Sequence, residues 1–260
     1  MCLILFAYQR HADYPLVLIA NRDEYYARPT HDAHWWDETP VFAGRDLEAG
    51  GTWLGISRRG RFAAVTNVRE ADGMHPGKRS RGALTHNFLA GDTPARAYLE
   101  ALMPHDRDYA GFNLLLGDDS GFWFYSNRDH GIRRIEAGVH GISNGAFDEP
   151  WPKLSSGKAE LAALLDGEFT QADLLEILTD HRIAQDHELP QTGVPLDIER
   201  MLSSRFIRSP DYGTRACTVL TIDRDNRVEF CEQNFRDAEH GGERIIESFD
   251  IDPPCNFGWQ

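Results

Sequence analysis

The second residue of the chain is a cysteine, and it opens an apolar run over residues 2–8. Removal of Met1 by an aminopeptidase, which generally requires a small second side chain, would leave Cys2 with both a thiol and a free α-amine. The amine titrates near ~7.7–8.0 and the thiol near ~8.5, so the amine is able to take the thiol proton at neutral pH. A nucleophile paired with an N-terminal amine is an established catalytic arrangement. The alternative is a buried strand cysteine that acts as a small hydrophobic side chain.

Four consecutive polar residues, Asn21, Arg22, Asp23 and Glu24, follow the second apolar run. If the two apolar runs pair as a hairpin, this cluster lies near the N-terminus. An arginine and a carboxylate there would position the thiolate and the ammonium of Cys2, whereas the alternative is a turn and cap. Neighbours in a regular strand point to opposite faces. Either the strand therefore ends at Arg22, or one role falls to Asn21 or Glu24.

Two asparagines stand where amide groups are able to serve catalysis. Asn67 follows an apolar stretch, and Asn144 lies between Ser143 and Gly145. Both positions also suit turns, because Asn and Gly favour them. The functional interpretation is that each amide NH₂ donates a hydrogen bond to an oxyanion beside the nucleophile.

Arginines gather in two stretches before the last strongly apolar segment, at residues 203–208 and 211–215. Arg205, Arg208 and Arg215 would contribute little energy as exposed ion-pair partners of an acidic surface. The alternative is that one of them binds a substrate carboxylate in bidentate fashion.

Charge and composition exclude some classes of partner. The formal net charge is −14, from 27 Lys and Arg against 41 Asp and Glu, which argues against nucleic acid or an anionic membrane surface as the main partner. Basic stretches at 58–61 and 78–81 are interpreted as solvated loop charges. A hydrophobic share of 41% is ordinary for a soluble globular protein.

No apolar run reaches the ~18–20 residues that a membrane helix needs. The run at 2–8 has no basic region before it and no cleavage site after it, so no signal peptide is expected. The chain has four sparse cysteines, which do not resemble a disulfide framework, and it shows no zinc-ligand spacing. They are Cys2, Cys217, Cys231 and Cys255. We expect a cytoplasmic protein with reduced thiols, no metal and no cofactor.

Apolar runs separated by turn residues predict four hairpins. Their strands pair 2–8 with 16–20, 50–56 with 62–68, 113–116 with 122–126, and 218–222 with 228–231. Helical patterns occupy 81–90 and the region around Leu161, and Thr170–Asp173 resembles a capping box before a further helix. This arrangement predicts an α+β fold with antiparallel sheets covered by helices. Without linkers or repeats, a single domain over 1–260 is expected, and oligomeric state stays open.

Seven motifs, taken in order, resemble those of the NRDE family, also called the transport and Golgi organisation protein 2 family. They are the initial Met-Cys, Asn21–Glu24, Gly51–Gly55, Thr66–Arg69, Ser80–Gly82, Ser143-Asn144 and Tyr212–Arg215. The family is similar to N-terminal nucleophile hydrolases, such as choloylglycine hydrolases and penicillin V acylases. The resemblance therefore implies a four-layer αββα sandwich with two antiparallel sheets.

The resemblance also implies roles for individual residues. Cys2 would be the nucleophile and its α-amine the general base. Arg22 and Asp23 would hold the thiolate and the amine. Asn67 and Asn144 would line the oxyanion hole.

An arginine from residues 205–215 would complete this arrangement, with Arg205 favoured and Arg215 as its rival. One departure from the pattern concerns spacing. Choloylglycine hydrolases separate their arginine and aspartate by two residues, whereas Arg22 and Asp23 are adjacent here.

Three functions are weighed. The leading hypothesis is an amidohydrolase or acyltransferase that cleaves a non-peptide amide, or a thioester, through an acyl-enzyme on Cys2. The second is a non-catalytic carrier of haem or of an acyl-CoA-like ligand, and the third is an interaction scaffold. Candidate pocket aromatics for a carrier are Trp35, Trp36, Trp53, Trp123 and Phe147, and candidate haem ligands are His31, His34 and His86. The sequence does not specify the acyl group or the leaving group.

Overall fold

Two antiparallel sheets form the centre of the computed structural model, which describes residues 2–70 and 79–255. Met1 and Lys78 lie outside the described residues. The six-stranded sheet has the order β10 (Gly138–Ile142), β1 (Cys2–Tyr8), β2 (Leu16–Tyr25), β11 (Tyr212–Ile222), β12 (Arg227–Phe235) and β13 (Gly241–Asp250). The seven-stranded sheet has the order β3 (Thr30–Trp35), β4 (Val41–Asp46), β5 (Leu54–Ser57), β6 (Phe62–Asn67), β7 (Phe112–Asp118), β8 (Gly121–Ser126) and β9 (Arg133–Arg134).

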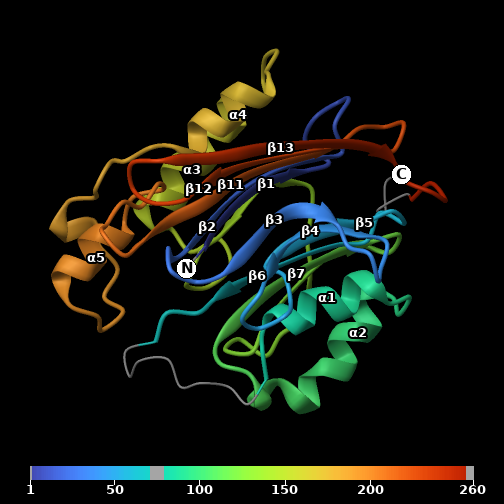
Figure 1. Ribbon diagram of the computed structural model, residues 1–260, viewed down its shortest axis with the longest axis horizontal. Coiled ribbons are helices and arrows are strands. Elements are labelled where there is room, and N and C mark those ends of the chain that lie inside the picture. The colour runs from blue at the N-terminus through green and yellow to red at the C-terminus, as the bar shows by residue number, and fades with distance from the viewer. Residues whose placement is uncertain (1, 71–78, 256–260) are drawn as a thin grey trace.

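Helices cover the outer face of each sheet (Figure 1). The pair α3 (Pro152–Leu164) and α4 (Gln171–Leu178) packs on the six-stranded sheet, and the pair α1 (Gly82–Ala90) and α2 (Ala95–Leu102) packs on the seven-stranded sheet. The remaining short helices are η1 (Met103–Asp108), η2 (Asp186–Glu188) and α5 (Leu196–Leu202). No helix among the described residues has the length and apolarity that a membrane crossing demands.

Three apolar clusters fill the spaces between these layers. One lies between the two sheets and includes Ile4, Phe6 and Phe124. The others lie between a sheet and its own helices, as Leu5 and Leu161 do on the six-stranded side. The predicted four-layer αββα sandwich is confirmed, because each sheet buries both of its faces.

The four predicted hairpins are all present as β1–β2, β5–β6, β7–β8 and β11–β12. The first predicted helix ends at Gly91, and Thr170 and Asp173 form the predicted capping box of α4. The sequence did not predict β3, β4, β10 or β13. In β13 a single residue, Phe249, is buried and most of the others are exposed, which is typical of an edge strand and hides the apolar alternation.

The register of the first hairpin places the candidate nucleophile. Cys2 pairs directly with Arg22, and Leu3 pairs with Asn21. Side chains alternate along a strand, so Cys2 shares the inter-sheet face with Ile4, whereas Leu3 faces the helices. The thiol therefore lies at one end of the sheets, on the side where they face each other.

Candidate active site

Cys2 is the partly exposed cysteine of the four, and all four are free thiols. Its direct cross-strand partner is Arg22, and side chains in such pairs lie within contact distance. Burial raises the pKa of the Cys2 thiol, while the positive charge of Arg22 and a hydrogen bond from the Asp23 backbone act in the opposite direction. Cys2 thus combines a cationic neighbour with partial exposure of the residue, whereas the other three cysteines are buried.

Arg22 is a buried cation held by an aromatic ring. It is 6% exposed, and its guanidinium carbon lies 4.2 Å from the centre of the Trp53 ring. Its Nη1 is buried and has no hydrogen-bond partner. A Cβ at Gly44 would lie 2.3 Å from the Trp53 ring, so the absence of a side chain there makes room for the indole.

Asp23 faces the other side of β2, as strand alternation requires. It is 1% exposed, and its Oδ1 accepts a hydrogen bond of 2.7 Å from the Thr214 hydroxyl on β11. Burial raises the pKa of the Asp23 carboxyl, and the nearby charge of Lys153 opposes that shift. Because β2 runs on to Tyr25, the strand does not end at Arg22 as one alternative proposed.

The other two residues of the polar cluster have structural partners. Asn21 donates its amide to the carbonyls of Leu178 and Arg205, at 2.9 and 2.8 Å. Glu24 lies 3.9 Å from Arg28 in an ion pair. The structure therefore leaves Arg22 and Asp23 as the members of the cluster whose charges act on Cys2.

A set of hydrogen bonds joins the ends of three strands around Cys2. The Ser143 hydroxyl donates to the Cys2 carbonyl at 3.3 Å, and the Thr66 hydroxyl donates to the Ser143 carbonyl at 2.6 Å. Asn113 reinforces the same loop by donating to the carbonyl of Gly145 at 2.9 Å. The ends of β1, β6 and β10 are thus fixed to one another beside the thiol.

The two candidate oxyanion donors, Asn67 and Asn144, differ in whether the side-chain amide already donates a hydrogen bond within the protein. The amide of Asn144, which is 1% exposed, donates to the Asn67 carbonyl at 2.9 Å, and the Asn144 carbonyl accepts from the Arg69 backbone at 2.7 Å. The side chain of Asn67 is partly exposed and makes no hydrogen bond to any residue that the structure describes. Asn67 therefore has a free side-chain amide donor, whereas the side chain of Asn144 holds the backbone of Asn67 in place.

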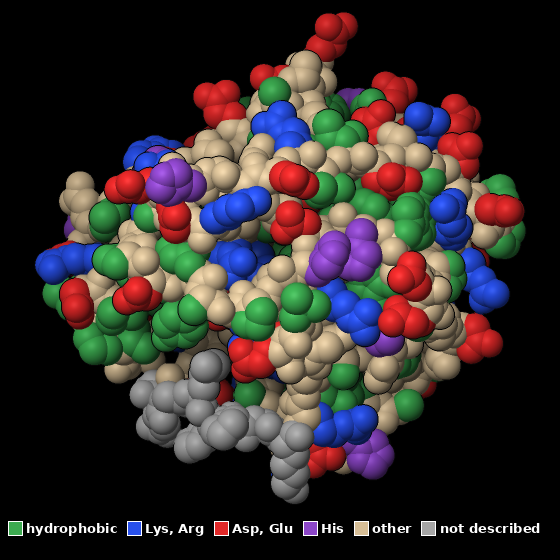
Figure 2. Space-filling view, in the orientation of Figure 1, with side chains coloured by type: hydrophobic (Ala, Val, Ile, Leu, Met, Phe, Trp, Pro, Cys, Tyr) green, Lys and Arg blue, Asp and Glu red, His purple; other side chains and the backbone are tan. Residues whose placement is uncertain are grey.

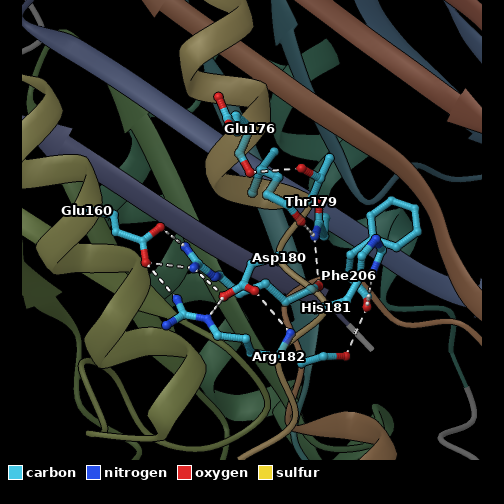
Figure 3. A network of polar contacts seen from close by, with 11 residues as sticks. Glu160, Glu176, Thr179, Asp180, His181, Arg182 and Phe206 are labelled. Atoms are coloured by element: carbon cyan, nitrogen blue, oxygen red, sulfur yellow. Dashed lines mark hydrogen bonds and ion pairs between the residues drawn. The ribbon is translucent and has the colours of Figure 1, made fainter.

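Arg205 does not join this group. Its guanidinium binds Glu160 through two hydrogen bonds, of 2.7 and 2.8 Å, and Asp180 through a third of 2.5 Å. In Figure 3, Glu160 and Asp180 lie together with Arg182 beside α3 and α4, on the helical side of the six-stranded sheet. The arginine favoured from the sequence is 2% exposed, and both of its terminal nitrogens bind carboxylates of this ion-pair network.

Arg215 takes a different position, set by a β-bulge. The pairing of β11 with β2 shifts between Thr214 and Ala216, so Arg215 is the extra residue. Its Nη1 donates to the carbonyls of Tyr25, Tyr26 and Arg28, at 3.0, 3.2 and 2.9 Å. The bulge brings Arg215 to the same cavity that Arg22 and Trp53 line. Arg208 is exposed and lies over Phe206.

Two cations near Cys2 were missed as candidates. Lys153 is 4% exposed and donates to the Leu202 carbonyl at 2.9 Å. Burial lowers the pKa of Lys153 to about 8, against the charges of Asp23 and Cys2. Burial also lowers the pKa of Arg81, against the charge of a Cys2 thiolate. The Ser80–Gly82 motif was a signal for Arg81, whereas Lys153 at a helix start resembles a surface residue.

The histidines and aromatic residues proposed for a haem or acyl-CoA carrier do not gather around one pocket. No cluster of three or more His, Cys, Asp or Glu suited to a metal ion occurs within residues 2–70 and 79–255. The rings of His31 and His34 lie 4.0 Å apart, but His86 packs against Trp36. Trp35 packs on Phe249. Among the aromatics proposed for a ligand pocket, Trp53 lines the cavity beside Arg22.

Comparisons with known proteins agree with this architecture. A family model described as Transport and Golgi organisation 2 matches residues 1–237. The Transport and Golgi organization protein 2 homolog of Bos taurus is 34% identical, over 90% of this chain and 93% of its own. The Homo sapiens homolog is 33% identical, over 92% of this chain and 95% of its own.

A solved structure with low sequence identity shares the fold. A Caenorhabditis elegans N-acylethanolamine-hydrolyzing acid amidase ortholog superposes with a TM-score of 0.50 at 10% identity, covering 84% of this chain and 92% of its own. A conjugated bile acid hydrolase from Clostridium perfringens gives a TM-score of 0.45 at 9% identity, over 99% and 94% of the two chains. At such identities a likeness describes the fold and leaves the reaction open.

Proposed function

The chain belongs to the Transport and Golgi organisation 2 family, and from this premise and the surroundings of Cys2 we propose that it is a cysteine amidohydrolase or acyltransferase. Its substrates would be non-peptide amides or thioesters. The observation that carries the proposal is the direct cross-strand pairing of Cys2, a partly exposed residue, with the buried cation Arg22. The free amide of Asn67 at the end of β6 supports it.

The first half of the reaction forms an acyl-enzyme. Once Met1 has been removed, the α-amine of Cys2 takes the thiol proton, and the thiolate attacks the substrate carbonyl. Arg22 stabilises the thiolate, and Asp23 stabilises the ammonium. Asn67 donates to the oxyanion, an interaction worth ~3–4 kcal/mol in comparable sites. The C–N or C–S bond then breaks, and the ammonium returns its proton to the leaving nitrogen or sulfur.

The second half restores the thiol. The amine takes a proton from water, whose oxygen attacks the thioester carbonyl and releases a carboxylic acid. In an acyltransferase an amine, alcohol or thiol takes the place of that water. The sum for hydrolysis is amide plus water giving acid plus amine, so no oxidant, reductant or metal is required.

An acyl-trapping experiment tests the proposal. We expect p-nitrophenyl acetate to give a burst of one nitrophenolate per chain, with the acetyl group located on Cys2 by peptide mapping and Met1 absent from the intact mass. Cys2→Ala should lose the burst, and Cys231→Ala, which removes a fully buried thiol, should retain it. Retained Met1, or acetylation that is unchanged in Cys2→Ala, would overturn the mechanism and favour a non-catalytic carrier.

A further inference from the structure

A cavity of about 50 Å³ lies beside Arg22, where β2, β11 and β12 approach β3 of the other sheet. Such a volume accommodates about four water-sized groups. Figure 2 shows basic side chains near the middle of the face on which, in Figure 1, β2 and β12 end. The cavity is thus small, is lined by the cross-strand partner of Cys2, and has three arginines but one carboxylate, Asp32, among its lining residues.

Two arginines, Arg22 and Arg215, line this cavity, and each has one guanidinium donor without a partner. Nη1 of Arg22 and Nε of Arg215 are both buried, and neither has a hydrogen-bond partner. A buried donor on a charged group that lacks an acceptor destabilises the folded protein, because the donor has lost its hydrogen bonds to water. Native structures retain such groups chiefly where a ligand, ion or water completes them. The two unused donors therefore point to an acceptor that the protein itself does not supply.

The charges that line the cavity also indicate an anionic ligand. Burial lowers the pKa of Arg215, and the positive charge of Arg22 lowers it further, because the two cations repel each other. Arg236 adds a third cation at the exposed rim. Asp32, a carboxylate in the wall, and Glu24 oppose this lowering of the Arg215 pKa through their negative charges, although neither forms an ion pair with Arg22 or Arg215 among the described residues.

The shape of the donors favours a planar anion. The Trp53 ring fixes the plane of the Arg22 guanidinium, and three backbone carbonyls fix that of Arg215. Rigid guanidinium edges match the two oxygens of a carboxylate. Asn234, a further wall residue, already donates to Glu232 and so adds little to the recognition.

We propose that this cavity, called the Arg22–Arg215 pocket, binds a carboxylate of the substrate. Arg22 links the pocket to the nucleophile, because it lines the cavity and is also the direct cross-strand partner of Cys2. The carboxylate and the carbonyl that Cys2 attacks would therefore lie no further apart than one arginine side chain spans. This last step rests on the proposed function, whereas binding of the carboxylate does not require catalysis.

The test measures binding by calorimetry to the Cys2→Ala protein, which cannot be acylated. The probes are 2-(acetylthio)acetate, its methyl ester, and the phosphonate that replaces the carboxylate. We expect the carboxylate to bind at least tenfold more tightly than the ester and the phosphonate. Arg215→Gln in the same background should remove this preference. Arg227→Gln, which changes an exposed arginine of β12, should preserve it.

Equal affinity for the carboxylate and its ester would overturn the proposal, and tighter binding of the phosphonate would overturn the assignment to a carboxylate. The comparison between probes uses a protein with an intact pocket, so it holds even if Arg215→Gln does not fold. A carboxylate preference together with failure of the acyl-trapping experiment would support the pocket and reject the proposed catalysis. The two proposals therefore fail separately.

Discussion

Arg22 lies over the indole of Trp53, with its guanidinium carbon 4.2 Å from the ring centre, and no carboxylate within the described residues forms an ion pair with it. A cation–π contact of this kind contributes ~0.5–2 kcal/mol. Unlike a carboxylate, the ring leaves the positive charge of Arg22 uncompensated. The charge is therefore available to a Cys2 thiolate on one side and to a ligand in the Arg22–Arg215 pocket on the other.

The position of Trp53 depends on Gly44, and this gives a first prediction. A methyl group in Gly44→Ala would lie 2.3 Å from the indole, so the ring and the guanidinium above it must shift. Misplacement of a catalytic group by about 1 Å can cost ~10²-fold, and we expect acylation by p-nitrophenyl acetate to slow by about 10- to 100-fold. The rate of the nitrophenolate burst measures this.

Gly131→Ala is the matched control, because its added methyl group would have no neighbour closer than 4.0 Å. We expect that variant to acylate at the wild-type rate. An unchanged burst rate in a folded Gly44→Ala protein would show that the position of Arg22 over Trp53 does not matter to the reaction.

A second prediction separates the two asparagines. Asn67→Ala removes a free amide, so we expect acylation to slow by roughly 10²–10³-fold with little change in melting temperature. Asn144→Ala breaks the hydrogen bond to the Asn67 carbonyl from a residue that is 1% exposed, so both the rate and the melting temperature should fall. Burst kinetics and thermal unfolding of the two variants provide the comparison. A fast Asn67→Ala enzyme would remove Asn67 from the oxyanion hole.

Much of the architecture was predictable from the sequence because it depends on residues that are close together in the chain. The run at 2–8 and the run from Leu16 alternate between two buried faces, and the turn between them leaves one sensible pairing. That pairing also predicts that the polar cluster after the second strand meets Cys2. Thr170 and Asp173 satisfy each other within one helical turn, so their capping box needs no distant partner.

The arginine that lines the cavity beside Arg22 was not predictable from local patterns. Arg205 was favoured, but its partners Glu160 and Asp180 are distant in sequence and become neighbours through the packing of α3 and α4. Arg215 reaches the cavity because of a bulge opposite β2, and nothing in the order of residues marks a bulge at that position. The roles of these arginines are set by tertiary pairing rather than by local preference.

The ion-pair network of Arg205 gives a third prediction, which concerns stability. Arg205→Met leaves Asp180 and Glu160 without their main partner, and Asp180 depends on Arg205 to keep its pKa lowered to about 2 despite burial. We expect the free energy of unfolding to fall by about 3 kcal/mol, the lower end for a buried pair because both carboxylates are partly exposed. Urea unfolding measures the change.

Arg182→Met is the control for that network, since Arg182 contacts the same two carboxylates with a side chain that is 71% exposed. It should cost less than about 1 kcal/mol. Acylation per folded molecule should be unchanged in both variants. A specific loss of acylation in folded Arg205→Met would return Arg205 to the active site.

The fourth prediction concerns Lys153 and pH. Burial lowers its pKa from 10.5 to about 8, so between these values the unfolded chain binds a proton that the folded protein does not. Stability should therefore rise with pH across this window, and the unfavourable contribution of about 3 kcal/mol below pH 8 should disappear above 10.5. Subtracting the pH profile of Lys153→Met removes other titrating groups, such as tyrosines and thiols. Urea unfolding of both proteins from pH 7 to 11 gives the difference, and a flat difference would mean that Lys153 remains charged in the folded protein.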